Sequence, residues 1–236
     1  MLVIKRRSVL IITALLVTAI AFLVCFGALS TTTNALIKRI VVVLDAGHGG
    51  VDGGVIGVST GVKESELNLS ITKKVQKHLV DAGIEVVLTR STDAGLYGLA
   101  TNKLKKKDMK KRKEIIEKVK PSLVVSIHMN KYSLSSRRGG QVFYREDILE
   151  SKILANCLQN EFNEVYKDVK PYSPLKGDYY ILNCTNYPSV IAECGFLSSH
   201  KDEALLITEE HREAVAYSIF KGIINYLAET TDNFTN

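Results

Sequence analysis

Short apolar runs alternate with amphipathic stretches along most of the chain. Apolar runs rich in β-branched residues predict strands at Ile40–Leu44, Ile84–Leu88, Leu123–Ile127, Gln141–Tyr144, Tyr179–Leu182 and Ser189–Ala192. Apolar residues at helical spacing predict helices over Leu67–Leu79, Lys103–Val119, Ile148–Phe162 and from Thr208 to about Leu227. This order is typical of an α/β fold with a mostly parallel sheet of about six strands and helices on both faces.

The N-terminal segment has a different pattern. Three basic residues at positions 5–7 precede an uncharged run of 22 residues, Ser8–Leu29, and about 20 apolar residues suffice to cross a bilayer. The run is longer than the apolar part of a typical secretory signal. We therefore expect a membrane-spanning signal-anchor in residues 1–30, with the rest of the chain outside the cytoplasm. Cleavage near Ala28-Leu29-Ser30, which would release a secreted protein, is the alternative.

Behind this segment the pattern predicts a linker over 31–39, one domain over 40–228 and a tail over 229–236. Hydrophobic residues make up 46% of the 236 residues, which excludes wholesale disorder. The domain has three cysteines, Cys157, Cys184 and Cys194, and no C-x-x-C motif. An odd number leaves at least one thiol free or paired with another chain, and we expect three small buried residues.

The formal charge of +6 comes from one segment. Lys103–Lys120 contains ten basic and three acidic residues, a local charge of +7, so the remainder carries about −1. One interpretation is a solvated helix face. The other is attraction to an anionic wall polymer or to phospholipid head groups, which salt would screen. Nucleic acid is a poor candidate because no aromatic residues lie between the charges.

Candidate chemistry follows three predicted strands. His48 comes after the first strand, His128 after the third and Glu193 after the last. Glu64 and Glu66 open the first predicted helix. Ligands of open α/β sheets bind outside the carboxyl ends of the strands, so these groups could converge on one rim of the sheet.

Two imidazoles and one carboxylate are a common catalytic zinc set that leaves a fourth position for water. The apolar neighbours of Glu193 would raise the pKa of its carboxyl, which suits a general base. A simpler alternative is that the glycines around His48 serve a tight turn and that Glu64 and Glu66 are ordinary first-turn carboxylates favoured by the helix dipole. The other histidines, His78, His200 and His211, lie in polar helical surroundings and are expected on the surface.

Five motifs occur in order over about Ile40 to Leu227, nearly the whole domain. They are Asp45-Ala-Gly-His-Gly-Gly, Gly61-x-x-Glu64-x-x-Leu67-Asn68-Leu69, Leu88-Thr89-Arg90-x-x-Asp93, Ser126-Ile127-His128-x-Asn130 and Glu193-Cys194-Gly195-Phe196-Leu197-Ser198. In these motifs the chain resembles the zinc-dependent N-acetylmuramoyl-L-alanine amidases of the type 3 family. Its single-domain layout is most similar to the germination-specific members, which act on spore cortex.

The resemblance implies a twisted, mostly parallel sheet with Zn2+ held by His48, Glu64 and His128. Glu64 rather than Glu66 matches the family, whose ligand lies three residues before Leu67-Asn68-Leu69. It implies Glu193 as the catalytic glutamate, which moves a proton from the attacking water to the leaving amine. The bond cleaved is the amide between the lactyl group of N-acetylmuramic acid and L-alanine of peptidoglycan. In the germination subgroup this cleavage leads to muramic lactam in the cortex.

The resemblance is weaker around the substrate. Asn130 and Arg112 are the expected substrate-binding residues, although the basic stretch offers several candidates for the family's arginine. Lys131-Tyr132 stands where a small residue is more usual. The partners expected are peptidoglycan, the membrane through the N-terminal segment and an exported or lipid-anchored activator. A catalytically idle wall-binding protein and a zinc peptidase that cuts within the stem peptide are the alternatives.

Overall fold

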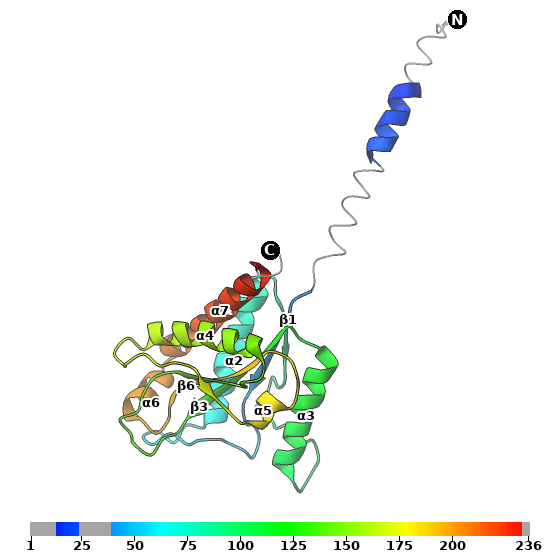
Figure 1. The fold of residues 1–236 in the computed structure, drawn as a ribbon. Helices are drawn as coiled ribbons and strands as arrows, with labels where there is room; N and C mark the ends of the chain where they lie inside the picture. Colours follow the sequence, from blue (N-terminus) through cyan, green and yellow to red (C-terminus); the bar gives the residue numbers. More distant parts are fainter. Residues whose placement is uncertain (1–12, 24–38, 233–236) are drawn as a thin grey trace, which may run out of the picture. The chain divides into compact units, whose positions relative to one another are not determined.

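The computed structural model describes residues 13–23 and 39–232 (Figure 1). The chain divides into two compact units, residues 1–39 and 40–236. In the first unit, residues 13–23 form a helix. None of the described helices is both long and apolar enough to cross a membrane. Most of the expected signal-anchor (1–12 and 24–30) and the linker to residue 38 lie outside the described residues, so both stay predictions.

The second unit is built on a six-stranded sheet with the strand order β2-β1-β3-β6-β4-β5. Its strands are β1 (Val41–Ala46), β2 (Glu85–Leu88), β3 (Leu123–Asn130), β4 (Gln141–Tyr144), β5 (Leu175–Lys176) and β6 (Ser189–Phe196). All neighbouring pairs are parallel except β4 and β6, which are antiparallel. The predicted mostly parallel α/β sheet is confirmed.

Helices cover both faces of this sheet (Figure 1). One face packs against α2 (Glu64–Asp81), α4 (Leu149–Val165) and α7 (Glu209–Asp232). The other packs against α3 (Leu104–Val119) and the short α5 (Tyr180–Asn183). A further helix, α6 (His200–Leu206), follows β6.

Alternation along the central strands explains this arrangement. On β1, Val42 and Leu44 pack in the cluster that contains α2, α4 and α7, whereas Val43 packs with α3 and α5. All three side chains are fully buried. Successive side chains of a strand point to opposite faces, so a continuous apolar run is required where both faces are covered.

Three expectations need correction. β3 and β6 are longer than predicted, so His128 and Glu193 lie within these strands and not after them. Tyr179–Leu182 is not a strand, because Tyr180–Asn183 form α5 and the fifth strand is Leu175–Lys176. The segment is apolar because Ile181 and Leu182 pack beneath α3, which a single helical turn achieves as well as a strand. The three cysteines are free, but only Cys194 is buried, while Cys157 and Cys184 are half-buried.

Candidate metal centre and cleft

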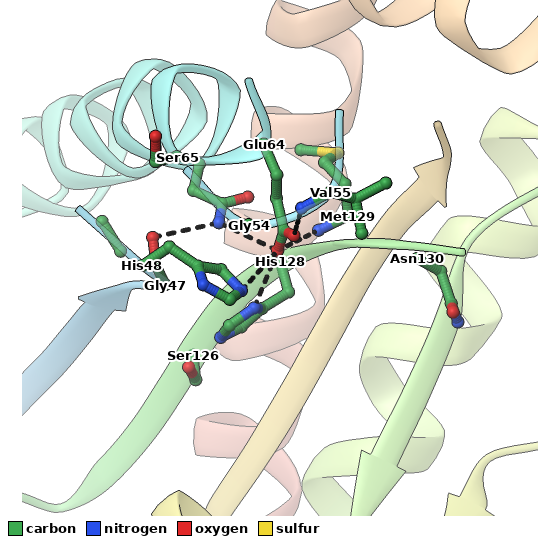
Figure 2. A network of polar contacts seen from close by, with 12 residues as sticks. Gly47, His48, Gly54, Val55, Glu64, Ser65, Ser126, His128, Met129 and Asn130 are labelled. Carbon is green, nitrogen blue, oxygen red and sulfur yellow. Dashed lines mark hydrogen bonds and ion pairs between the residues drawn. The ribbon is translucent and has the colours of Figure 1, made fainter. Parts of the chain in front are cut away.

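Three side chains from different parts of the chain meet at the carboxyl end of the central strands. His48, Glu64 and His128 each offer a ligand atom, and these atoms lie within 4.8 Å of one another. Figure 2 shows both imidazoles pointing at the Glu64 carboxylate. His128 Nδ1 is 2.9 Å and His48 Nε2 is 3.3 Å from Glu64 Oε1. Among the described residues this is the one such group of His, Cys, Asp and Glu side chains.

Backbone amides orient the Glu64 carboxylate. It is only 1% exposed, and it accepts hydrogen bonds from the Val55 amide (2.8 Å) and the Met129 amide (3.1 Å). Asn68 Nδ2, one turn further along α2, adds a bond of 3.2 Å. Glu66 is exposed, since residues two apart on a helix point in nearly opposite directions. The structure therefore brings Glu64, and not Glu66, to the histidines.

Two glycines make room for the cluster (Figure 2). A Cβ on Gly47 would lie 2.2 Å from the His128 ring, and one on Gly54 would lie 2.4 Å from Glu64 Oε2. Gly54 also has a φ of +70°, a conformation that side chains rarely adopt. The glycines around His48 thus allow close approach to the ligand side chains.

The electrostatics of the cluster favour positive charge. His48 Nδ1 lies 2.9 Å from Asp52 Oδ1. Burial alone would lower the pKa of His48, but hydrogen bonds and charge from Glu64 and Asp52 raise that pKa to about 9. Burial would raise the pKa of Glu64, but His128 and His48 hold it well below its usual range. Such a site stabilises a bound cation, either protons or a metal ion.

Glu193 stands beside the cluster on the neighbouring strand. It pairs with His128 in the parallel register of β3 and β6, so the two side chains leave the same face of the sheet. Its Oε2 is buried without a hydrogen-bond partner among the described residues. Burial raises the pKa of Glu193 to about 7, with a further rise from Glu64 and opposing effects of His128 and His48. This carboxyl can exchange protons near neutral pH.

A cleft of about 810 Å³ opens next to these groups. Its lining combines His48, Glu64, His128 and Glu193 with residues of α3 and with the segment around Tyr179. Tertiary folding therefore places an open space where a substrate can reach all four side chains.

The two expected substrate-binding residues differ in position. Asn130 lines the cleft, although its Oδ1 accepts a bond from the Lys131 amide, and Figure 2 shows it apart from the cluster. Arg112 also borders the cleft but is 1% exposed, and its donors are used by protein oxygen atoms. Contact of either residue with substrate stays a prediction.

The other three histidines lie elsewhere. His78 pairs with Glu213, His200 with the Ser59 hydroxyl and His211 with the Tyr166 hydroxyl. Only His200 is exposed, so the expected surface position is wrong for His78 and His211, which are half-buried.

Sequence reasoning gave no role to Asp52 and Arg90. Asp52 contacts Nδ1 of His48, the ring nitrogen that faces away from Glu64. A single aspartate in a glycine-rich loop gives no indication in the sequence that it makes this contact. Arg90 belongs to the third motif and bonds to the backbone of the His48 loop. The motif can be recognised in the sequence, but the sequence does not show which backbone carbonyls Arg90 contacts.

Comparisons with known proteins agree with this geometry. The sequence profile of a family described as N-acetylmuramoyl-L-alanine amidase matches residues 42–225. The germination-specific N-acetylmuramoyl-L-alanine amidase of Bacillus subtilis is 31% identical over 196 residues, which is 81% of each chain.

Solved structures show the same similarity. The CwlD amidase of Clostridioides difficile, solved in complex with the GerS lipoprotein, is 37% identical with a TM-score of 0.76. The catalytic domain of the amidase CwlV from Bacillus (Paenibacillus) polymyxa var. colistinus is 34% identical with a TM-score of 0.70. Each comparison covers 80% of this chain and 98% of the other.

Proposed function

Because this chain belongs to the N-acetylmuramoyl-L-alanine amidase family, we propose that it uses zinc to cleave the amide between the lactyl group of N-acetylmuramic acid and L-alanine of peptidoglycan. It is an enzyme of the cell wall, and membership of this family implies action outside the cytoplasm. The observation that carries the zinc-dependent reaction is the convergence of His48, Glu64 and His128 beside the Glu193 carboxyl.

The donor set fits zinc. Two imidazole nitrogens and one carboxylate oxygen are ligands that zinc prefers, and three protein ligands leave a position open for chemistry. The Asp52 carboxylate beside His48 and the amides on Glu64 are the kind of outer contacts that hold zinc ligands in place. Zinc bound by these residues would lower the pKa of water and polarise the amide carbonyl.

Glu193 is proposed to move the proton. Its carboxylate takes a proton from the attacking water and delivers it to the nitrogen of the leaving L-alanine, so the amide bond breaks with no net change in protonation of the enzyme. A pKa of about 7 allows both transfers at neutral pH. Within the described part of the chain its Oε2 has no hydrogen-bond partner, which leaves this carboxyl free to transfer a proton.

A digest tests this reaction directly. Purified peptidoglycan is incubated with the chain from Thr31 onward plus zinc, with and without chelator, and the products are read by mass spectrometry. We expect free stem peptides with an N-terminal alanine that disappear on chelation. Fragments cut within the stem would instead identify a peptidase. Zinc binding without any release would point to a missing activator or the wrong substrate, and the absence of zinc binding would favour a catalytically idle wall-binding protein.

Substitution of Glu193 by Gln tests the proton carrier. The amide is similar in size to the carboxyl but cannot accept the proton. The rate of hydrolysis should therefore fall by about 10²–10⁴-fold, the contribution that general acid–base catalysis typically makes. Zinc content by metal analysis and thermal unfolding should stay near those of the unmodified chain. Turnover close to that of the unmodified chain would contradict the mechanism.

We further propose spore cortex as the substrate, with muramic lactam as the eventual product. Support comes from the relative in Bacillus subtilis, which is named germination-specific, and from the similarity to CwlD. Parallel digests of cortex and of vegetative peptidoglycan should show faster release from cortex. Equal rates would leave the amidase activity intact but remove the cortex preference.

An activating partner is proposed on similar grounds. The C. difficile relative was solved with a lipoprotein bound, and an activator could act on this chain by ordering its metal site. A purified chain that binds zinc stoichiometrically and cleaves at a high rate by itself would contradict this.

A further inference from the structure

Two buried arginines converge on the loop that carries His48. Arg90 follows β2 and Arg112 lies on α3, and their side chains are 3% and 1% exposed. Arg90 belongs to the Leu88–Asp93 motif, which the proposed reaction does not use. Both guanidinium groups lie against the backbone of this loop.

Together the two side chains bind three consecutive backbone carbonyls. Ala46 O accepts from Arg90 Nε and from Arg112 Nη1, each at 2.8 Å. Gly47 O accepts from Arg90 Nη2 at 2.8 Å, and His48 O accepts from Arg112 Nη2 at 2.7 Å. The backbone from the end of β1 to His48 is therefore fixed from both sides.

Arg90 also links two of the ligand-bearing segments. Its Nη2 donates to Ser65 O at 2.8 Å as well as to Gly47 O. Ser65 is the residue after Glu64 in the first turn of α2. One guanidinium thus joins the backbone next to His48 with the backbone next to Glu64.

Burial of two neighbouring cations is unfavourable unless acidic groups neutralise them. Arg112 is paired with Asp45 and with Asp108, whose Oδ2 lies 2.6 Å from Nε. Asp45 is held in turn by the hydroxyls of Thr89 and Ser126, each at 2.6 Å. Each guanidinium makes four hydrogen bonds to the protein, which makes the network rigid.

The backbone of His48 needs such support. Its φ is +59°, in the left-handed region that a residue with a side chain adopts at a cost unless its surroundings enforce it. The carbonyl bonds from Arg112 and Arg90 supply that enforcement on both sides of the residue.

We propose that Arg90 and Arg112 are positioning residues of the metal centre, which fix the His48 backbone relative to Glu64 and so set the affinity for zinc. Neither acts on substrate. The inference rests on the proposed metal site, because it assigns the arginines a role toward those ligands. It also replaces the substrate contact expected for Arg112 with an indirect role.

Arg112→Lys tests the proposal, since it keeps the charge but loses the fork that reaches Asp45, Asp108 and two carbonyls at once. We expect zinc affinity, measured by competition with a chelator, to fall about 10–100-fold, the range found for outer contacts of metal sites. The absorption spectrum of the cobalt-loaded chain should change, since it reports ligand geometry. At saturating zinc, KM should stay near that of the unmodified chain.

Arg138→Lys is the matched control. Arg138 is also a largely buried guanidinium between two carboxylates, Asp202 and Asp168, but its hydrogen bonds go to neither ligand loop. Its replacement should leave zinc affinity unchanged. Arg90→Lys should lower zinc affinity as Arg112→Lys does, and circular dichroism of each metal-free variant shows whether it folds.

Unchanged zinc affinity in both folded arginine variants would overturn the proposal. The proposal would also be overturned if Arg112→Lys bound zinc normally but had a raised KM at every zinc concentration, because that pattern indicates contact with the substrate. If the unmodified chain binds zinc but releases no peptide from any peptidoglycan, with or without an activating partner, the proposed reaction fails while the affinity comparison still decides the role of the arginines. If it binds no zinc at all, both proposals fail.

Discussion

Single residues decide whether the ligands can meet. Gly47 directly precedes His48, but the space that a side chain at this position would need is occupied by the ring of His128, 81 positions away along the chain. In the same way, a side chain at Gly54 would collide with the carboxylate of Glu64. These positions follow from three-dimensional contacts, although the sequence marks the glycine-rich loop as unusual.

Gly47→Ala should therefore damage the metal site. The added methyl lies 2.2 Å from the His128 ring, so the ring must shift, and overpacking of this kind costs about 1–3 kcal/mol. We expect weaker zinc binding and a lower free energy of unfolding, measured by calorimetric titration and urea denaturation. Gly53→Ala is the control, since its Cβ would have ordinary contacts of 3.4 Å or more; equal behaviour of the two variants would contradict the steric argument.

Asp45 should make the stability of the domain depend on acid. Burial would raise its pKa, but Arg112, Ser126 and Thr89 lower it from 3.8 to about 2. A carboxyl with a lowered pKa stabilises the folded state above the unfolded value, here contributing about 2 kcal/mol, and loses that contribution as the pH falls from about 4 to 2.

Urea denaturation between pH 5 and pH 2 measures this contribution. The unmodified chain should lose more stability over this range than Asp45→Asn, which should already be less stable at pH 5. Parallel decreases in the two free energies of unfolding would show that Asp45 is not the group responsible.

At the scale of elements, α3 combines an internal and an external role. Its inner side carries Arg112 and Asp108 into the buried network, and Ile116 into the core beneath the sheet. Its first turn contains no acidic residue and no side-chain cap, although the helix dipole favours negative charge there. A charge pattern that opposes local stability is often kept at functional sites.

The exposed lysines of this region are not equivalent. Lys110, Lys111 and Lys113 pair with glutamates on α3 itself. Lys105 instead lines the cleft, as does Lys131 after β3. Both are exposed, and we expect them to attract the free carboxylates of stem peptides.

Neutralisation of both residues, Lys105→Gln with Lys131→Gln, should raise KM several-fold for peptidoglycan fragments and weaken the dependence of the rate on salt. Long-range attraction between exposed charges is screened above about 0.1 M salt. Lys118→Gln removes an exposed lysine from the far end of α3 and should change neither quantity. If the double variant has an unaltered KM and salt dependence, the basic residues of α3 do not attract the substrate and the helix is simply exposed to solvent.

At the scale of the whole molecule, the parallel sheet assembles the site. The ends of β1, β3 and β6 are neighbours in the sheet and bring His48, His128 and Glu193 together from segments 65 to 80 residues apart. The start of α2 supplies Glu64. A metal ion bound by these ligands would therefore link β1, α2 and β3, and should stabilise them together.

Zinc should raise the stability of the chain by mass action. At a free concentration 100 times the dissociation constant, one site adds about 2.7 kcal/mol, which differential scanning calorimetry detects as a higher Tm. Chelator should reverse the shift, and His128→Ala should abolish it. A zinc-induced shift that survives in His128→Ala would place the metal elsewhere.

The fold class and the strands that carry the reactive side chains followed from the pattern of residues, but the ends of β3 and β6 did not, since both strands continue past the predicted ends. Apolar runs buried on both faces and connections long enough for helices leave few arrangements other than a parallel sheet. His48, His128 and Glu193 could be located because parallel strands end on one rim. The strand Tyr179–Leu182 was wrong because short apolar runs fit a helical turn equally well.

How these residues are held depends on contacts that form in the folded chain. From the residues alone Glu64 and Glu66 were equivalent, and the folded chain separates them by the direction each takes from α2. The sequence placed Arg112 among many surface cations, whereas packing of α3 against β1 buries it on the carbonyls around His48. Local patterns record what each residue can do, but the partner of a buried charge is set by contacts between segments far apart in the chain.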